Sequence, residues 1–444
     1  MSDIILSLDI GTSKIAAIAW NCSNKETLDI VSAVNDSTLA GLPSKYHEQD
    51  PDCVYRICSE LLMKLIENGT FSATDVKTIA ISGQMHGVLL ANKQLRPLSN
   101  LMTWCDQRSA KLVASINRAN WPVERTGCYL HAGYGGATLA MLVSEQGIPA
   151  GAIALTIADY VAARLCGVIG IDASHAASWG IMDVKNKCWD RELIDRLGIP
   201  FDVLPEIRSD LFELGNVTAD IRLPGNVSVR LPIGDNQASF FGTCGLANDA
   251  VLLNLGTGGQ ISLPSPEFDF KLELETRPLP FGGYLQVGAS LCGGRSYAHL
   301  KDFFKQALMS FSGQEFDDGE LYRIMDSMAG DAETELAVDT RFAGTRLDTG
   351  LSGSIKGIKT DNFTPGALCR GFTRGMIREL TGMVDRSAVE KFNRVMISGN
   401  GIRKNPLAQQ FIMEELGISC VSVKSKEEAA VGAAMAAAKA GGLL

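Results

Sequence analysis

The feature that most constrains the fold is a turn motif that occurs twice. "LDIGTSKIA" at residues 8–16 and "LNLGTGGQIS" at 253–262 each pass from a short apolar run through Asp or Asn into Gly-Thr and a small residue. Each stretch predicts two strands joined by a glycine turn. "IAISGQMHG" at 79–87 and "VMISGNGIR" at 395–403 repeat a second pattern, a strand entering a glycine turn, in the same order. Two paired repeats in one order indicate internal duplication of an α/β core.

Strand and helix signals alternate along the chain. Apolar runs bounded by Gly, Asn or Pro predict strands, and apolar residues at i, i+3, i+4 and i+7 predict helices over 51–69 and 366–384. The expected strands are 4–10, 14–20, 76–83, 250–256, 261–266, 284–290 and 394–401. The expected fold class is therefore α/β, with sheets covered by helices.

The length of the chain predicts two large domains. With 444 residues, 46% of them hydrophobic, the chain exceeds the size at which one core stops growing, about 250–300 residues. The second half is expected to begin near Leu246, which divides the chain into domains 1–245 and 246–444. The net charge of −9 has no compensating basic block, so neither nucleic acid nor an anionic membrane surface is an expected partner. A phosphorylated cofactor would need local binding devices.

Eleven scattered cysteines without a C-x-x-C pair argue against a disulfide framework and against a zinc site. Asp3 and Asp9 interrupt the first apolar run, which is neither a signal peptide nor a transit sequence, so a cytosolic protein is expected. The small-residue stretch from Ala429 is too short for a membrane span and predicts a helix packed closely on a sheet. The oligomeric state stays open between monomer and homodimer, because no coiled-coil heptads occur.

The first turn offers groups that suit phosphate and a hard cation. Gly11 lets the backbone approach an oxyanion closely, and Thr12 and Ser13 offer hydroxyls and main-chain N–H donors. Asp9 at the strand end can hold Mg²⁺ through water. Taken alone, this stretch is more typical of an ordinary β-turn with a solvated Asp. Two such loops, one from each domain, would grip a triphosphate from both sides.

Nine motifs in order carry a resemblance to a known family. They are "DIGTS" (9–13), "ISGQMHGV" (81–88), "LMTWCDQRS" (101–109), "TIADYVAARLCG" (156–167), "ASWG" (177–180), "IGDNQAS" (233–239), "NLGTGGQ" (254–260), "SGNGIRKN" (398–405) and "EEAAVGAA" (427–434). With them the chain resembles the FGGY carbohydrate kinases, of the actin, Hsp70 and hexokinase superfamily. The resemblance implies two ribonuclease H-like domains with a cleft between them, the first for sugar, base and one phosphate loop, the second for ATP.

The resemblance also implies roles for single residues. Asp235 in "GDNQAS" falls at the family's general base, where a carboxylate accepts the proton of the attacking sugar hydroxyl. The segments that line the sugar pocket in relatives contain Gln84, Met85, His86, Asp106, Arg108, Asn236 and Gln237. The segments that bind nucleotide contain Gly11, Thr12, Ser13, Gly256, Thr257, Gly258, Gly294, Gly399, Asn400, Gly401 and Asn405, with Asp9 as the magnesium ligand.

Several of these residue types have a structural explanation as well. His86 and Trp104 are, taken alone, more typical of a core, and Gly-Asn-Gly more typical of a turn. The chain also departs from the family pattern, because Ala16 stands where relatives often carry Lys or Arg. Lys14 would point to the same face of the strand and is the candidate replacement. Gly399-Asn400-Gly401, which the resemblance aligns with the family's adenosine motif, lacks the adjacent Gly-Gly pair that is common there.

The expected reaction is ATP- and magnesium-dependent phosphoryl transfer to the terminal primary hydroxyl of a ketose. The resemblance favours sedoheptulose as the acceptor, giving the 7-phosphate and ADP. Another sugar, such as xylulose, is the alternative substrate. An inactive actin-like regulatory protein that binds nucleotide is the alternative function. A dinucleotide-dependent oxidoreductase is disfavoured, since no G-x-G-x-x-G follows the first strand.

Overall fold

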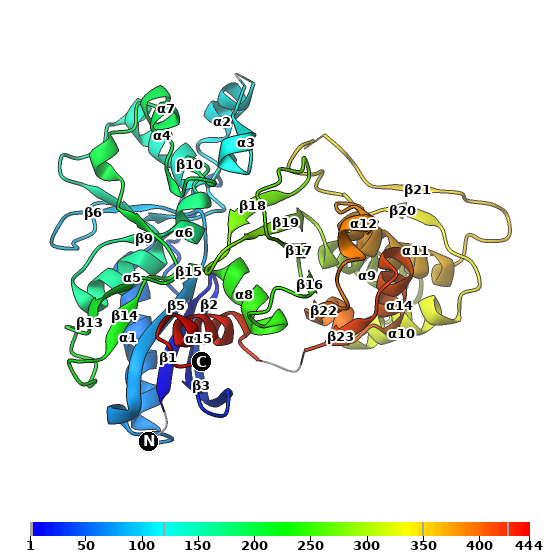
Figure 1. The fold of residues 1–444 in the computed structure, drawn as a ribbon. Coiled ribbons are helices and arrows are strands. Elements are labelled where there is room, and N and C mark those ends of the chain that lie inside the picture. Colours follow the sequence, from blue (N-terminus) through cyan, green and yellow to red (C-terminus); the bar gives the residue numbers. More distant parts are fainter. Residues whose placement is uncertain (1–2, 119, 349, 424–425) are drawn as a thin grey trace.

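Two sheets with the same strand order form the framework of the protein (Figure 1). The computed structural model describes residues 3–118, 120–348, 350–423 and 426–444. In the first sheet the order is β14 (Ser228–Arg230), β5 (Val76–Gly83), β1 (Ile4–Ile10), β2 (Lys14–Asn21) and β3 (Glu26–Val34), with β13 (Glu213–Asn216) at the edge and β15 (Ile233–Gly234) also on β5. In the second it is β23 (Cys420–Ser422), β22 (Val395–Ser398), β16 (Val251–Leu255), β17 (Gly259–Ser265) and β19 (Tyr284–Ser290), with β18 (Glu275–Pro278) beyond β19.

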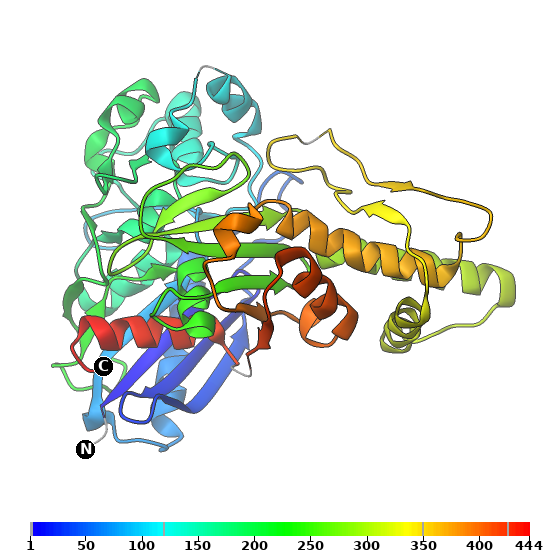
Figure 2. The same cartoon turned by 45° about the vertical axis from the view of Figure 1, so that its right-hand side comes forward.

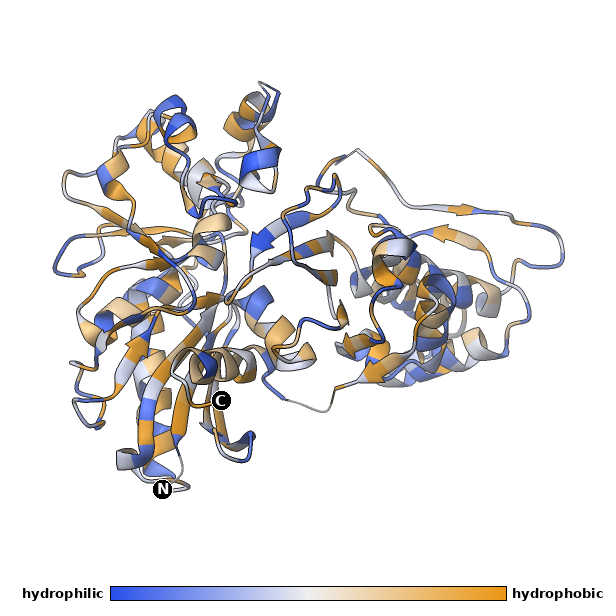
Figure 3. Cartoon of the chain, in the orientation of Figure 1, coloured by the Kyte–Doolittle hydropathy of each residue, from blue (hydrophilic) through white to orange (hydrophobic). Residues whose placement is uncertain are grey.

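The matching order confirms the predicted duplication of one core. In each half two antiparallel strands are joined by the repeated turn, and the fourth core strand runs parallel to the first. A main-chain hydrogen bond closes each turn: the N–H of Gly11 donates to the carbonyl of Lys14 at 3.0 Å, and that of Gly256 to the carbonyl of Gly258 at 2.9 Å. The strands are hydrophobic where they face neighbouring layers (Figure 3).

Helices cover both sheets. The first half contains α1 (Pro51–Glu67), α2 (Ala110–Asn117), α3 (Val123–Thr126), α4 (Gly135–Glu145), α5 (Ile157–Cys166), α6 (Ala173–Ala177), α7 (Arg191–Arg196) and α8 (Asp235–Cys244). The second contains α9 (Gly294–Ser312), α10 (Asp318–Asp331), α11 (Pro365–Thr381), α12 (Arg386–Val389), α13 (Asn400–Arg403), α14 (Pro406–Leu416) and α15 (Glu428–Ala440). Short paired strands are β4 (Glu48–Gln49), β6 (Leu89–Ala91), β7 (Leu101–Met102), β8 (Ile153–Leu155), β9 (Ile171–Asp172), β10 (Met182–Asp183), β11 (Cys188–Trp189), β12 (Ile207–Arg208), β20 (Ala337–Asp339) and β21 (Ser354–Lys356).

Local signals account for the two helices expected from periodicity. Asp50 caps α1 by accepting from the N–H groups of Asp52 and Cys53, and Pro51 stands at its first position. Thr364 and Pro365 do the same for α11. The strand expected over 394–401 is too long. It ends at Ser398, because Gly399 adopts φ +81° and the chain then enters α13.

The C-terminal helix α15 returns to the first half of the molecule. It packs against β5, β1 and α8, and Figure 2 shows it (red) beside the blue strands of the first sheet. The hydroxyl of Ser7 in β1 donates to the carbonyl of Ala430 at 2.7 Å. One buried cluster joins Ile5 of the first sheet, Phe240 of α8 and Leu252 of the second sheet. The sheets thus share a core through α8 and α15, as expected for a helix packed closely on a sheet.

Two further expectations can be compared with the structure. All eleven cysteines lie in the described part of the chain, and each is a free thiol. Among the helices described, none combines the length and the apolar character that crossing a membrane requires.

Candidate active site

The predicted base, Asp235, lies at the same sheet edge as Asp9. Ile233 of β15 pairs with Ser82 of β5, and Ser82 pairs with Asp9 of β1, so three neighbouring strands bring both carboxylates together. Asp235 is the first residue of α8. An anion there is stabilised by the helix dipole. Chain topology therefore places two acidic groups beside the first phosphate turn.

Burial raises the pKa of both carboxyl groups. For Asp235 burial raises the pKa to about 6, against the opposing effect of the positive Arg277. For Asp9 burial, together with the negative charge of Asp235, raises the pKa to about 7, against a hydrogen bond from Ser82. A carboxyl group with a pKa near 6 to 7 can accept and release a proton near neutral pH.

The first phosphate turn is held by a ring of hydrogen bonds. The hydroxyl of Thr12 donates to Oε1 of Gln84 at 3.1 Å and accepts from Nε1 of Trp104 at 3.0 Å. Gln49 donates to the carbonyl of Thr12 at 2.8 Å and accepts from Gln84 at 2.9 Å. The Thr12 side chain therefore joins the turn to the sugar-side segment. Ser13, the next residue of the turn, is exposed.

Trp104 lies differently from the expectation. Its side chain is 48% exposed, so the prediction of a core tryptophan is wrong. The hydrogen bond to Thr12 satisfies its indole N–H and leaves the ring face accessible. Asp106 and Arg108, on the same loop, pair with each other at 2.8 Å, and Arg108 also pairs with Glu48 at 2.7 Å. Their polar contacts within the described residues brace the loop that carries Trp104.

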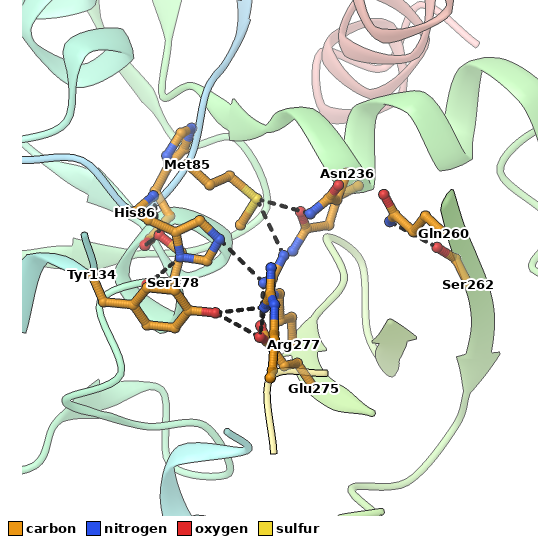
Figure 4. Close-up of polar contacts among 12 residues, drawn as sticks. Met85, His86, Tyr134, Ser178, Asn236, Gln260, Ser262, Glu275 and Arg277 are labelled. Atoms are coloured by element: carbon orange, nitrogen blue, oxygen red, sulfur yellow. Dashed lines mark hydrogen bonds and ion pairs between the residues drawn. The ribbon is translucent and has the colours of Figure 1, made fainter. Parts of the chain in front are cut away.

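A second group of sequence candidates gathers at the N-terminus of α8 (Figure 4). Asn236 donates to Sδ of Met85 at 3.6 Å, and Nδ1 of His86 lies 2.7 Å from the carbonyl oxygen of Ser178. Gln237 is buried and donates to the carbonyl of Pro278 at 3.2 Å. Its Oε1 is a buried acceptor without a partner among the described residues. Residues 151 positions apart in the sequence are thus in polar contact at the start of α8.

The second sheet adds two residues that the sequence analysis missed. Glu275 and Arg277 stand on one face of β18 and reach Tyr134 and His86 of the first half. A small cavity beside Glu275 is lined by both halves, with Cys128 and His131 from one and Val287 and Arg346 from the other. The sequence did contain a usable signal for a functional pair. Glu275 and Arg277 carry opposite charges at i and i+2 of "LETRPL", and residues at that spacing share one face of a strand.

The nucleotide-side candidates converge on the second glycine turn. A Cβ on Gly294 would lie 2.2 Å from the carbonyl oxygen of Gly256, so the start of α9 packs directly on the Gly256–Gly258 turn. A Cβ on Gly399 would lie 2.4 Å from the carbonyl oxygen of Leu255, which brings Gly399, Asn400 and Gly401 to the same strand end. The backbone thus approaches closely where helix N-termini can bind phosphate.

Asn405 lies on the far side of this group. It caps α14 by accepting from the N–H of Ala408, and its amide donates to Asp326 at 3.1 Å. Tyr297 of α9 donates to the same Asp326 oxygen at 3.1 Å. The three side chains link α9, α10 and α14 behind the glycine turns.

The acidic pair fits a magnesium ion that is shared with phosphate. In the described part of the chain, no group of three or more His, Cys, Asp or Glu side chains is arranged to hold a metal ion. Mg²⁺ usually takes one or two carboxylates, with water and substrate phosphates as its other ligands. Asp9, which lies beside Asp235 and the phosphate turn, meets that requirement.

Comparisons with known proteins show the family of the chain. Residues 4–242 match the N-terminal domain, and residues 252–441 the C-terminal domain, of the FGGY family of carbohydrate kinases. The chain is 26% identical to the sedoheptulokinase of Mus musculus over 97% of this chain and 96% of that protein. It is 24% identical to a xylulose kinase of Lactococcus lactis over 99% and 88% of the two chains. A ligand-bound xylulose kinase from Lactobacillus acidophilus has the same fold, with a TM-score of 0.87 at 21% identity over 99% and 90% of the chains.

Proposed function

The chain belongs to the FGGY family of carbohydrate kinases, and we propose that it transfers the γ-phosphoryl group of ATP to the terminal primary hydroxyl of a ketose. The observation that carries this proposal is the position of Asp235. It begins α8 at the edge of the first sheet, close to the Gly11–Ser13 turn and Asp9, and its neighbour Asn236 contacts Met85. Retention of a carboxylate at this point favours a kinase over an inactive regulatory protein that binds nucleotide.

The chemistry follows from this geometry. Asp235 accepts the proton of the sugar hydroxyl while the oxygen forms its bond to the γ-phosphorus, and the bond between that phosphorus and the β,γ-bridging oxygen breaks to give ADP. Asp235 then releases the proton to solvent as the product leaves. Main-chain N–H groups of Thr12 and Ser13 in the first turn, and of Thr257 and Gly258 in the second, bind the phosphate oxygens, while those of Gly11 and Gly256 close the turns. A magnesium ion, held by Asp9, would stabilise the negative charge that develops on the phosphate oxygens.

Sedoheptulose is the proposed acceptor, and xylulose is the alternative. Similarity to the mouse sedoheptulokinase extends over nearly the whole of both chains and supports the heptulose. Similarity to xylulose kinases, in sequence and in fold, supports the pentulose. The domains proposed for the two substrates are residues 1–245 for the sugar and 246–444 for ATP, with α15 packed on the first sheet.

A coupled ADP-release assay tests the proposal. Wild type, Asp235→Asn and, as a matched control, the exposed-surface variant Asp195→Asn are assayed with ATP and Mg²⁺ on sedoheptulose, xylulose, ribulose, fructose and glycerol. We expect sugar-dependent turnover that is highest on sedoheptulose, retained in Asp195→Asn and lost in Asp235→Asn. A maximum on another sugar would change the substrate. Absence of turnover on every sugar, with ATP still bound, would favour the regulatory alternative.

A further inference from the structure

Arg277, in the second half of the chain, reaches Met85 and His86 of the first half. It lies on β18, opposite Leu285 of β19, and only 3% of its surface is exposed. Nη1 of Arg277 donates to Sδ of Met85 at 3.6 Å, and Nη2 lies 3.3 Å from Nε2 of His86 (Figure 4). The same Met85 sulfur accepts from Asn236, the neighbour of Asp235. The guanidinium therefore lies beside the first turn of α8.

The hydrogen bonds of His86 assign its tautomer. Nδ1 faces the carbonyl oxygen of Ser178, which only accepts, so Nδ1 carries the proton. Nε2 then has a lone pair and accepts from Nη2 of Arg277. Burial and the positive charge of Arg277 keep the pKa of His86 well below its ordinary value, so the ring stays neutral. Both ring nitrogens are engaged by protein, and His86 positions Arg277.

Glu275 anchors the opposite side of the guanidinium. It pairs with Arg277 and with Arg346 and accepts from the hydroxyl of Tyr134 at 2.5 Å. The Tyr134 ring stacks on His86, with centroids 4.1 Å apart. Although burial opposes it, the positive charges of Arg277 and Arg346 keep the pKa of Glu275 well below its ordinary value, so it stays ionised. Arg277 is thus held in one orientation by charged and aromatic neighbours from both halves.

This anchoring leaves part of the guanidinium unused. A guanidinium has five N–H groups. Hydrogen bonds to Met85, His86 and Glu275 use three of them, as far as the described residues show. The remaining N–H groups belong to a side chain that is 3% exposed, so they have little contact with bulk water. An oxygen atom that enters with a substrate beside Asp235 is the acceptor that matches them.

We propose that Arg277 is a substrate-binding residue that donates to a sugar oxygen next to the reacting hydroxyl, so that the second half of the chain takes part in choosing the acceptor. The inference rests on the proposed sugar kinase function. It explains why a guanidinium buried at the edge of the second sheet points away from its own sheet into residues of the first half. His86 and Glu275 act as positioning residues for this contact.

Binding of unphosphorylated sugar, measured by isothermal titration calorimetry, tests the proposal. Arg277→Met removes charge and donors, and Arg277→Lys keeps the charge but loses the planar fork. Arg323→Met, at a side chain that is 76% exposed, is the control. We expect both Arg277 variants to bind the best ketose roughly 10- to 100-fold more weakly, as for loss of hydrogen bonds from a charged donor. ADP affinity should stay unchanged, which also shows that the variants are folded.

Monodeoxy derivatives of that ketose separate a direct contact from a structural role. If Arg277 binds one hydroxyl, the derivative lacking that hydroxyl loses affinity in wild type but not in Arg277→Met. A penalty that is equal in both proteins for every derivative would overturn the proposal, as would unchanged sugar affinity in Arg277→Met. If wild type binds no sugar of the panel, the proposed function itself fails, and this inference fails with it.

Discussion

Nζ of Lys14 lies 2.7 Å from Oε1 of Glu427, so an ion pair joins the first phosphate turn to the start of α15. The Lys14 side chain is 52% exposed, and an exposed pair of this kind contributes at most about 1 kcal/mol to stability. Ala16, by contrast, is fully buried. Lys14 is therefore the candidate, among the described residues of this turn, to replace the basic residue that the family resemblance expects near Ala16.

We predict that Lys14 exchanges Glu427 for a phosphate oxygen when ATP binds. Lys14→Met should raise the KM for ATP about tenfold, since a charge-assisted contact is lost, and should leave the KM for sugar nearly unchanged. Glu427→Gln is the matched control, because it removes the competing carboxylate and should not raise the KM for ATP. An equal increase in both variants would assign the effect to the ion pair instead of a phosphate contact.

The catalytic rate should depend on the ionisation of Asp235. Its pKa is raised from 3.8 to about 6, and only the ionised form accepts a proton. We expect log(kcat/KM) for the sugar to fall with a slope near one as the pH drops below about 6. A pH series with saturating Mg²⁺ and ATP measures this. A profile that stays flat down to pH 4.5 would exclude a base with this pKa.

The same pKa shift has a consequence for stability. Because the folded pKa of Asp235 lies above the unfolded value, its contribution is most favourable below pH 3.8 and is lost as the pH rises through about 6. Asp235→Asn should therefore raise the melting temperature at pH 8 by a few degrees, and the free energy of unfolding by at most about 3 kcal/mol. Turnover should fall by roughly 100-fold or more. Asp195→Asn should change neither quantity, and a lower melting temperature in Asp235→Asn would contradict the prediction.

Magnesium should be needed for turnover and should act through Asp9. Chelation of the metal with excess EDTA is expected to abolish ADP release, and readdition of Mg²⁺ to restore it. Asp9→Asn should raise the Mg²⁺ concentration that gives half-maximal rate by roughly tenfold or more, because an amide is a weaker ligand for a hard cation than a carboxylate. Asp249→Asn, at an exposed side chain, is the control. An unchanged magnesium requirement in Asp9→Asn would place the ion elsewhere.

The crossing of α8 and α15 should tolerate no added side chain. A Cβ on Gly432 would lie 1.8 Å from the carbonyl oxygen of Ala238, and one on Gly242 would lie 1.9 Å from that of Glu428. Gly432→Ala should lower the free energy of unfolding by about 1–3 kcal/mol, the usual cost of overpacking. It should also lower kcat, since α8 carries Asp235. Gly225→Ala, with open space around its Cβ, is the urea-denaturation control. Equal stability of the two variants would contradict the tight crossing.

Local patterns in the sequence were sufficient for the elements that carry the site. The expected strands 4–10, 76–83 and 284–290 coincide with β1, β5 and β19. Their apolar runs end in glycine or polar residues, and that information lies within a few neighbouring positions. The duplicated turns predicted two related cores, and the two sheets have the same strand order. The position of Asp235 beside Asp9 follows from the same topology, because parallel strands end at one edge.

Contacts between distant parts of the chain were beyond such patterns. Trp104 was expected in a core, yet a bond from its indole to Thr12 holds it at the surface of the site. The charges of Glu275 and Arg277 share one face of a strand, but no neighbouring residue indicates that Arg277 meets Met85 and His86. No local pattern encodes which face of an edge strand will meet another domain.

The sequence by itself determined that the protein has two related α/β cores with two glycine turns, and its family resemblance predicted phosphate binding at the turns and proton transfer at Asp235. Periodicity and turn chemistry are properties of consecutive residues, so they can be read before folding. Only the tertiary structure decided that α15 crosses back to the first sheet and that Glu427 pairs with Lys14. It also decided that Glu275 and Arg277 contact Tyr134 and His86 of the first half. These contacts depend on how two separately formed cores pack around α8 and α15, which no short stretch of sequence specifies.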